Sequence, residues 1–207
     1  MIGTIVGHVH ISNSISKLGA TIPSVNLPPI ETCDLQAGCH QKCYAMRGRF
    51  RFKNVKDVVR RNLDIWKNDP DGFERDVEIA AFPARFFRYH SSGDIPDGAY
   101  LRMMVRVAER CPGTSFLCFT KKFRIVNEFI DSGGVIPANL HIVYSAWGDF
   151  IPENPHNFPV AYVKFKDRES YIPKDAMPCQ GYCGDCVQTE RSCWDLKPGQ
   201  SVCFDEH

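Results

Sequence analysis

The chain has 207 residues, of which 43% are apolar and 12% aromatic, so it can bury a substantial core within the usual size of one domain. The formal net charge of +1 excludes a general attraction to nucleic acids or anionic membranes, so an electrostatic partner would have to bind a local patch. No segment approaches the roughly 18 consecutive apolar residues of a membrane-spanning helix, so we expect no membrane partner.

The N-terminal segment and the cysteine content both indicate a cytoplasmic protein. Met1 to Ser16 contains no Lys or Arg, and His8 and His10 interrupt its apolar run, so the segment does not resemble a secretory signal. Ten cysteines are too few in this length for a small disulfide scaffold, and a reducing cytosol disfavours such bridges. Metal binding is therefore the leading explanation of the cysteines.

Strands and helices alternate along the first half of the chain. Residues 25–28 end a short strand, and a polar loop with the first cysteines follows it. Apolar residues at helical spacing from Val55 to Trp66 predict a helix, which the Asn, Asp, Pro and Gly residues at 68–72 terminate. The aromatic segment 85–90 predicts a strand that runs into a turn at 91–94.

The alternation continues through the second half. An apolar stripe over 101–108 predicts a helix that ends at Cys111. Strands are expected at 115–120, 140–145 and 159–165, with a helix closed by Gly133 and Gly134 between the first two.

This order predicts an α/β protein of one domain, residues 1–207. Strands that alternate with helices of about ten to fifteen residues favour right-handed crossovers and a mainly parallel sheet of five or six strands. A complete barrel needs roughly 250 residues, so we expect a partial (β/α) barrel or an open sheet over 1–170. Residues 171–207 are turn-rich and form a cysteine-rich metal-binding tail, which we expect to close the open side.

Four cysteines of the tail lie within fifteen residues. They are Cys179, Cys183, Cys186 and Cys193. Four thiolates are enough for a tetrahedral zinc ion or for one cubane 4Fe-4S cluster. Zinc usually takes two separated short pairs, whereas here only Cys183 and Cys186 have two residues between them, which favours the cluster.

Three further cysteines, Cys33, Cys39 and Cys43, occupy the loop after the first strand. Three thiolates leave one iron of a cubane cluster open to a substrate or cofactor, unless His40 supplies the fourth ligand. The alternative is that these cysteines pack as small apolar residues. The spacing leaves open whether the two groups share one site or build two, and we favour two.

The remaining cysteines are less informative. Cys111 and Cys118 lie in or beside apolar segments, which favours a place in the core. Cys203 is either a spare residue or an alternative ligand.

Polar residues follow the predicted strands, where functional groups gather in parallel strand-helix folds. His90, Ser92, Gly93 and Asp94 follow one strand, and Lys121 follows the next. Asp94 is suited to bind an amine, Lys121 a carboxylate or phosphate, and His90 to act as an acid or base or to ligate a metal. The structural alternatives are a helix cap, a solvated lysine and a buried histidine. We expect a small-molecule site here.

A basic strip runs from Lys42 to Arg61, with eight basic residues against the single acid Asp57, and Phe50 and Phe52 lie among them. Such a strip suits phosphates and stacked bases, so nucleic acid is a candidate partner. A solvated helix face is the alternative.

Several segments, in this order, resemble a phage family called gene product eighty-eight. They are Ser16-Lys17-Leu18-Gly19, Leu27-Pro28 followed by Thr32-Cys33, Cys43-Tyr44-Ala45, Ser92-Gly93-Asp94, Phe119-Thr120-Lys121 and the closing cysteine run. The resemblance implies a viral iron-sulfur protein in the host cytoplasm and supplies no established reaction.

The layout also resembles the radical S-adenosylmethionine superfamily, whose partial barrels carry a three-cysteine cluster loop after the first strand. That loop has gaps of three and two residues in the superfamily, but of five and three residues here. The superfamily has two glycines and a glutamate where this chain has Ser92, Gly93 and Asp94. The resemblance thus implies S-adenosylmethionine as a second cofactor besides the clusters, and the differences in both motifs count against it.

The sequence thus predicts an iron-sulfur phage protein with one or two 4Fe-4S clusters, in the role of a redox or radical-type enzyme. The competing hypothesis is a nucleic-acid-binding protein with structural zinc or iron-sulfur sites.

Overall fold

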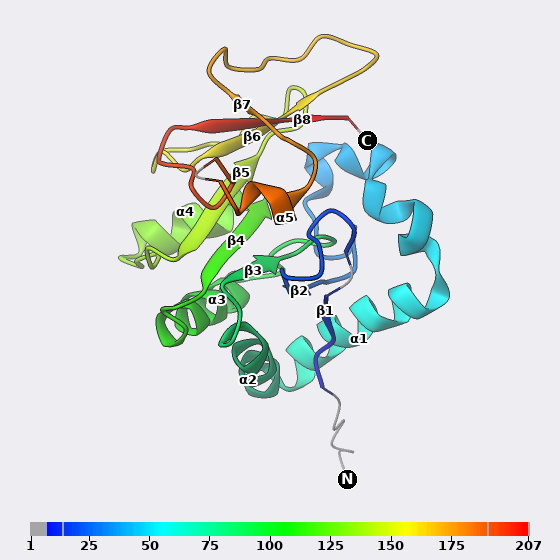
Figure 1. Ribbon diagram of the computed structural model, residues 1–207, viewed down its shortest axis with the longest axis vertical. Coiled ribbons are helices and arrows are strands. Elements are labelled where there is room, and N and C mark those ends of the chain that lie inside the picture. The colour runs from blue at the N-terminus through cyan, green and yellow to red at the C-terminus, as the bar shows by residue number, and fades with distance from the viewer. Residues whose placement is uncertain (1–7, 14, 190, 207) are drawn as a thin grey trace.

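The computed structural model of the protein describes residues 8–13, 15–189 and 191–206. Residues 1–7 and 14, part of the segment in which we expected no secretory signal, lie outside this range. Eight strands form one sheet in the order β1-β2-β3-β4-β5-β6-β8-β7 (Figure 1). β1 pairs antiparallel with β2, and every later pair is parallel.

The strands are β1 (Ile11–Ser12), β2 (Ser24–Val25), β3 (Phe86–Tyr89), β4 (Ser115–Thr120), β5 (Leu140–Ser145), β6 (Val160–Lys164), β7 (Met177–Pro178) and β8 (Ser201–Asp205). The helices are α1 (Lys53–Asn68), α2 (Pro70–Ala81), α3 (Gly98–Arg110), α4 (Phe123–Asp131) and α5 (Cys183–Cys186). Four short 3-10 helices precede α1, namely η1 (Leu35–Ala37), η2 (Cys39–Lys42), η3 (Tyr44–Met46) and η4 (Gly48–Arg51).

The expected α/β fold with a mainly parallel sheet is confirmed, and β4 and β5 coincide with the predicted strands. A barrel is not shown, because no pairing within the described residues joins β1 to β7 at the two ends of the strand order. The tail, which was expected to be turn-rich, also contains β7, α5 and β8. Its strand β8 pairs with β6 over five residues, so the tail extends the sheet itself.

Alternate side chains of the strands belong to two separate hydrophobic cores, because successive residues of a strand point to opposite faces of the sheet. Phe87, Tyr89 and Phe116 pack on the face that α1 to α4 cover. Leu117, on the other face, packs with Trp194 of the tail. Figure 1 shows the helices on one side of the sheet and the orange tail with α5 on the other. The tail therefore packs against the second face of the sheet and covers it.

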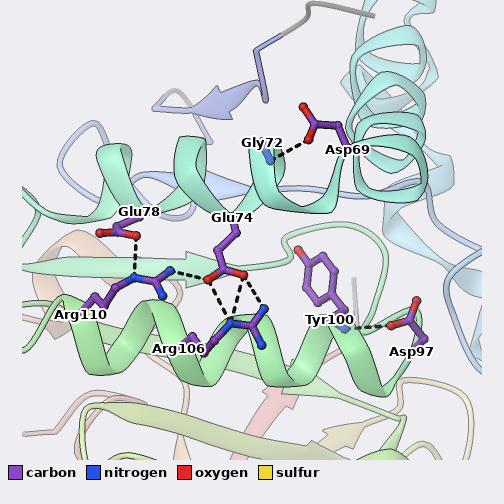
Figure 2. Close-up of polar contacts among 8 residues, drawn as sticks. All are labelled: Asp69, Gly72, Glu74, Glu78, Asp97, Tyr100, Arg106 and Arg110. Atoms are coloured by element: carbon purple, nitrogen blue, oxygen red, sulfur yellow. Dashed lines mark hydrogen bonds and ion pairs between the residues drawn. The ribbon is translucent and has the colours of Figure 1, made fainter. Parts of the chain in front are cut away.

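Helix α2 is anchored to α3 by charged contacts (Figure 2). The carboxylate of Glu74 accepts hydrogen bonds from Arg106 and Arg110, and Glu78 accepts one of 2.7 Å from Nε of Arg110. Burial works to raise the pKa of Glu74, but the hydrogen bonds from the two arginines outweigh it and lower that pKa. The same figure shows the helix starts, where Asp69 accepts from the Gly72 amide.

In the described part of the chain, no helix is both long enough and apolar enough to cross a membrane.

Candidate metal and ligand site

A cavity of about 420 Å³ lies on the face of the sheet that the tail covers. This volume falls within the usual range of small-molecule sites. Its lining includes the main metal and ligand candidates of the sequence, though not His40 or Cys203: Cys33, Cys39, Cys43, Cys179, Cys183, Cys186, Cys193, His90, Ser92, Gly93, Asp94 and Lys121. Segments up to 160 residues apart, from Cys33 to Cys193, thus meet at one place.

The three cysteines of the first loop lie close together, although the loop contains no long helix. The thiol of Cys33 interacts electrostatically with those of Cys39 and Cys43. The turn into η2 depends on Gly38, whose φ of 69° is left-handed and suits glycine. Burial, followed by the nearby Asp94 charge, raises the pKa of Cys33 to about 11. Its metal-free thiol is therefore protonated at neutral pH, and metal binding there would release the proton.

The four tail cysteines form a second group around α5. The thiol of Cys193 interacts electrostatically with those of Cys179, Cys183 and Cys186, and burial raises its pKa to about 12. Backbone bonds hold the group on the sheet, since the Cys183 amide donates to the Lys17 carbonyl and the Cys179 amide to the Cys203 carbonyl, both at 2.8 Å.

The cavity lining thus contains one group of three thiols and one group of four. In the described residues, no three His, Cys, Asp or Glu side chains are close enough to chelate a single metal ion.

The other cysteines and His40 lie apart from the cavity lining. Cys111 and Cys118 are buried in the core, as expected. Cys203 lies on β8 and does not line the cavity. His40 does not line it either, although its Nδ1 atom is buried without a hydrogen-bond partner in the described residues.

Asp94 joins the ends of β3 and β4. Its carboxylate accepts hydrogen bonds from the hydroxyl of Thr120 at 2.6 Å and from the amides of Lys121 and Ile95, both at 2.8 Å. Burial nevertheless raises its pKa. Asp94 is not the cap of α3, because Asp97 accepts from the Tyr100 amide there. The three donors leave Asp94 little capacity for an amine ligand.

The turn that holds Asp94 is attached to the first cysteine loop. Asn26 accepts hydrogen bonds from the amides of Ser91 and Ser92, and the hydroxyl of Ser92 donates to the carbonyl of Leu27 at 3.0 Å. Thr32, next to Cys33, accepts from the amide of Asp94 at 2.9 Å. The supporting roles of Asn26 and Thr32 were not predicted, because no periodicity in the sequence marks a loop residue that supports another loop.

His90 faces the helical core. Its Nε2 atom lies 3.0 Å from the hydroxyl of Tyr100, and its Nδ1 atom is buried without a partner in the described residues. Burial, with the Arg88 charge second, lowers its pKa to about 3, so the imidazole is neutral at physiological pH.

Arg88 is the main functional candidate that the sequence analysis missed. It lies on β3 between Phe87 and Tyr89, both on the opposite face, so it points into the cavity. Its charge interacts with Cys183 and Cys193 of the tail and also with Tyr44 beside the first group. Arg88 therefore lies between the two cysteine groups. Strand alternation at 85–90 is the signal that places it opposite the core residues.

The basic strip is partly neutralised. Lys42 pairs with Asp167 at 2.8 Å and with Glu206 at 2.9 Å. Lys53 pairs with Asp57, and Arg60 with Glu31. The other five basic residues are exposed and form no ion pair with a described residue: Arg47, Arg49, Arg51, Lys56 and Arg61.

Comparison with known proteins identifies a family. The family model described as gene product 88 matches residues 7–196, so the resemblance seen in the short segments extends over most of the chain. Nothing in the comparisons supports the resemblance to the radical S-adenosylmethionine superfamily. The searches of curated proteins and of solved structures found no significant match.

Proposed function

This chain belongs to the gene product 88 family, and we propose that it is an iron-sulfur protein whose two cysteine groups each hold a 4Fe-4S cluster. The observation that carries the proposal is that seven thiols, three from one loop and four from the tail, line a single cavity. The four-thiol group supplies a complete ligand set, and the three-thiol group leaves one iron open. A single shared cluster, with some thiols unused, is the alternative that iron content distinguishes.

The surroundings of the three-thiol group support a redox enzyme that acts on a small molecule. An open iron would bind a substrate or cofactor directly, and a cluster would supply single electrons. The chain's own residues would shape the site: Asp94 fixes the loop beside Cys33, and Lys121 places a cation near Cys39. A radical-type reaction with S-adenosylmethionine is a narrower version of this proposal, and the engaged carboxylate of Asp94 weighs against it.

Anaerobic purification, with iron, sulfide and zinc quantified alongside the visible absorption spectrum, tests the proposal. We expect iron and sulfide in equal amounts, a broad cluster absorption and little zinc. Stoichiometric zinc without sulfide would overturn the proposal in favour of structural metal sites.

The open iron can be tested separately by electron paramagnetic resonance of the reduced, cluster-loaded protein. We expect cyanide to change the spectrum of one cluster, because cyanide binds an iron that lacks a protein thiolate. The Cys39→Ala variant should lose the responding signal, whereas Cys203→Ala should keep it, because Cys203 does not line the cavity. An unchanged wild-type spectrum would exclude the open site.

Nucleic-acid binding is the second candidate function, and the five unpaired basic residues of the strip favour it. Together with the exposed ring of Phe52, they suit phosphates and stacked bases. Binding to single-stranded DNA should weaken steeply with salt. It should also weaken in an Arg49→Gln, Arg51→Gln double variant but not in the control Arg102→Gln, Arg124→Gln, which changes exposed arginines outside the strip. Equal binding by both variants would remove the strip as the binding surface.

A further inference from the structure

Among the cations that line the cavity, Arg88 and Lys121 form no ion pair with an acidic side chain of the described residues. Arg88 donates a hydrogen bond from Nε to the Tyr89 carbonyl at 3.2 Å, and its guanidinium lies 4.5 Å from the centre of the Phe119 ring. Its two terminal amino groups make no hydrogen bond or ion pair with the described residues. The aromatic face fixes the guanidinium in place while leaving its outer donors free for a ligand.

Lys121 supplies the second cation, at the end of β4. Its ammonium lies 6.0 Å from the centre of the Trp147 ring and makes no ion pair within the described residues. The neighbouring carboxylate of Asp94 is already engaged by three donors, one of them the backbone amide of Lys121. Asp94 thus fixes the backbone of Lys121 without pairing with its ammonium.

Three further cations line the cavity, namely Lys17, Lys42 and Arg191. Lys42 differs from Arg88 and Lys121 because it is paired with acids. Its ammonium binds both Asp167 and Glu206, and Glu206 also lines the cavity. The charge of Lys42 is therefore neutralised within the protein. Within the described residues, Arg88 and Lys121 have no such acidic partner.

The rest of the lining suits the body of an organic molecule. Leu117, Phe119 and Trp147 contribute apolar surface beside the two cations. A ligand with an anionic head and an apolar body would suit both the cations and the apolar surface of the lining. Its buried anion would receive two charge-assisted hydrogen bonds, which offset the cost of lost hydration.

We infer that the cavity binds a small organic anion, a carboxylate or a phosphate, whose charged group is held by Arg88 and Lys121. This inference rests on the proposed function in that it names the substrate class of the same site. It replaces the amine expected at Asp94 with an anion at the two cations. The competing explanation is that Arg88 and Lys121 serve only to balance the negative charge of the clusters.

Calorimetric titration of the anaerobically purified full-length protein, with its iron and sulfide content measured in the same sample, tests the inference. The probes are benzoate and phenyl phosphate, which separate carboxylate from phosphate, benzamide as the neutral isostere of benzoate, and benzylamine as the cation. We expect one of the two anions to bind at least about tenfold more tightly than benzamide and benzylamine, because a hydrogen bond to a charged group is stronger than one between neutral groups.

Matched variants assign the binding to the two cations. Arg88→Gln and Lys121→Gln should each weaken the anion about tenfold or more. Two controls should leave it unchanged. Arg85→Gln removes an arginine of the same region that lies over the Phe86 ring, and Lys122→Gln removes the adjacent lysine, and neither residue lines the cavity. Arg88→Lys keeps the charge and should retain part of the anion affinity. Partial affinity in this variant would show that the loss in Arg88→Gln comes from a missing ligand contact and not from misfolding.

The outcomes also separate this inference from the proposed function. Anion binding that depends on Arg88 and Lys121 would support the inference even in a protein without iron or sulfide, a result that would by itself overturn the clusters. A cluster-loaded protein that binds no anion, or that binds benzamide and benzylamine equally well, would overturn the inference and leave the clusters standing. Loss of cluster content in Arg88→Gln with unchanged anion affinity would establish the charge-balancing explanation instead.

Discussion

At the scale of single residues, the backbone conformation and a close neighbouring backbone require glycine at position 93. Its φ is +79°, and a Cβ atom there would lie 2.7 Å from the carbonyl oxygen of Leu27. Gly93→Ala should therefore lower the free energy of unfolding by more than about 1 kcal/mol, because the strained backbone and the clash act together. Gly113→Ala is the control, since nothing lies within 4 Å of its added methyl group. Chemical denaturation measures both, and equal effects would contradict this role.

His90 should make the protein sensitive to acid. Its folded-state pKa is about 3, against about 6.5 in the unfolded chain, so the unfolded state binds more protons between these values. Stability therefore falls as the pH falls below 6.5, by about 2 kcal/mol from this group between pH 7 and pH 5. His90→Asn removes the imidazole, and asparagine tolerates the φ of 61° at this position. We expect its stability to change less over that range, and identical pH profiles would contradict this assignment.

The residues with distinctive chemistry can be recognised in the sequence, but the residues that position them cannot. The cysteines, Asp94 and Lys121 were recognised because their spacing and their place after strands are visible in the sequence. Asn26 and Thr32 act through hydrogen bonds to a turn more than sixty residues away, which no local pattern reveals. Asp94 was expected to bind an amine, which requires free lone pairs on its carboxylate. Only the structure shows that three hydrogen-bond donors already occupy this carboxylate.

At the scale of elements, the contact between α2 and α3 depends on Glu74. Its side chain is 12% exposed, and it accepts hydrogen bonds from Arg106 and Arg110, which are about half exposed. Glu74→Gln should destabilise the protein by about 1 to 2 kcal/mol, less than a fully buried pair would, because water screens the arginines. Glu109→Gln on the exposed face of α3 should change stability by less than about 0.5 kcal/mol. Similar midpoints for both variants in urea would contradict the role of Glu74.

Among the elements that were not predicted, α2 and β8 were missed for different physical reasons. The residues 68–72 were interpreted as the end of one helix, and they do end α1. However, Asp69 and Pro70 also start α2 at once, as its cap and first residue. Strand β8 was missed because only five residues lie in it after a long irregular stretch, and its partner β6 is about forty residues away. Sheet pairing of this kind depends on tertiary contacts rather than on local pattern.

At the scale of the whole molecule, the fold brings two distant cysteine groups to one face of the sheet. The α/β class followed from the alternation of strands and helices, and the sheet is indeed mainly parallel. The shared cavity did not follow from it, because the position of the tail depends on the packing of Trp194 against the sheet and on the pairing of β8 with β6. The tail is thus part of the architecture that brings the thiols together.

The measurement that tests the central claim most directly is the iron and sulfide content of three variants, one in each cysteine group and one outside both. Two clusters correspond to about eight irons and eight sulfides per chain. We expect Cys39→Ala and Cys183→Ala each to lose about half of this content, each leaving the other cluster intact, and Cys203→Ala to keep all of it. Full content in both Cys39→Ala and Cys183→Ala, or zinc in place of iron and sulfide in the wild type, would contradict the account.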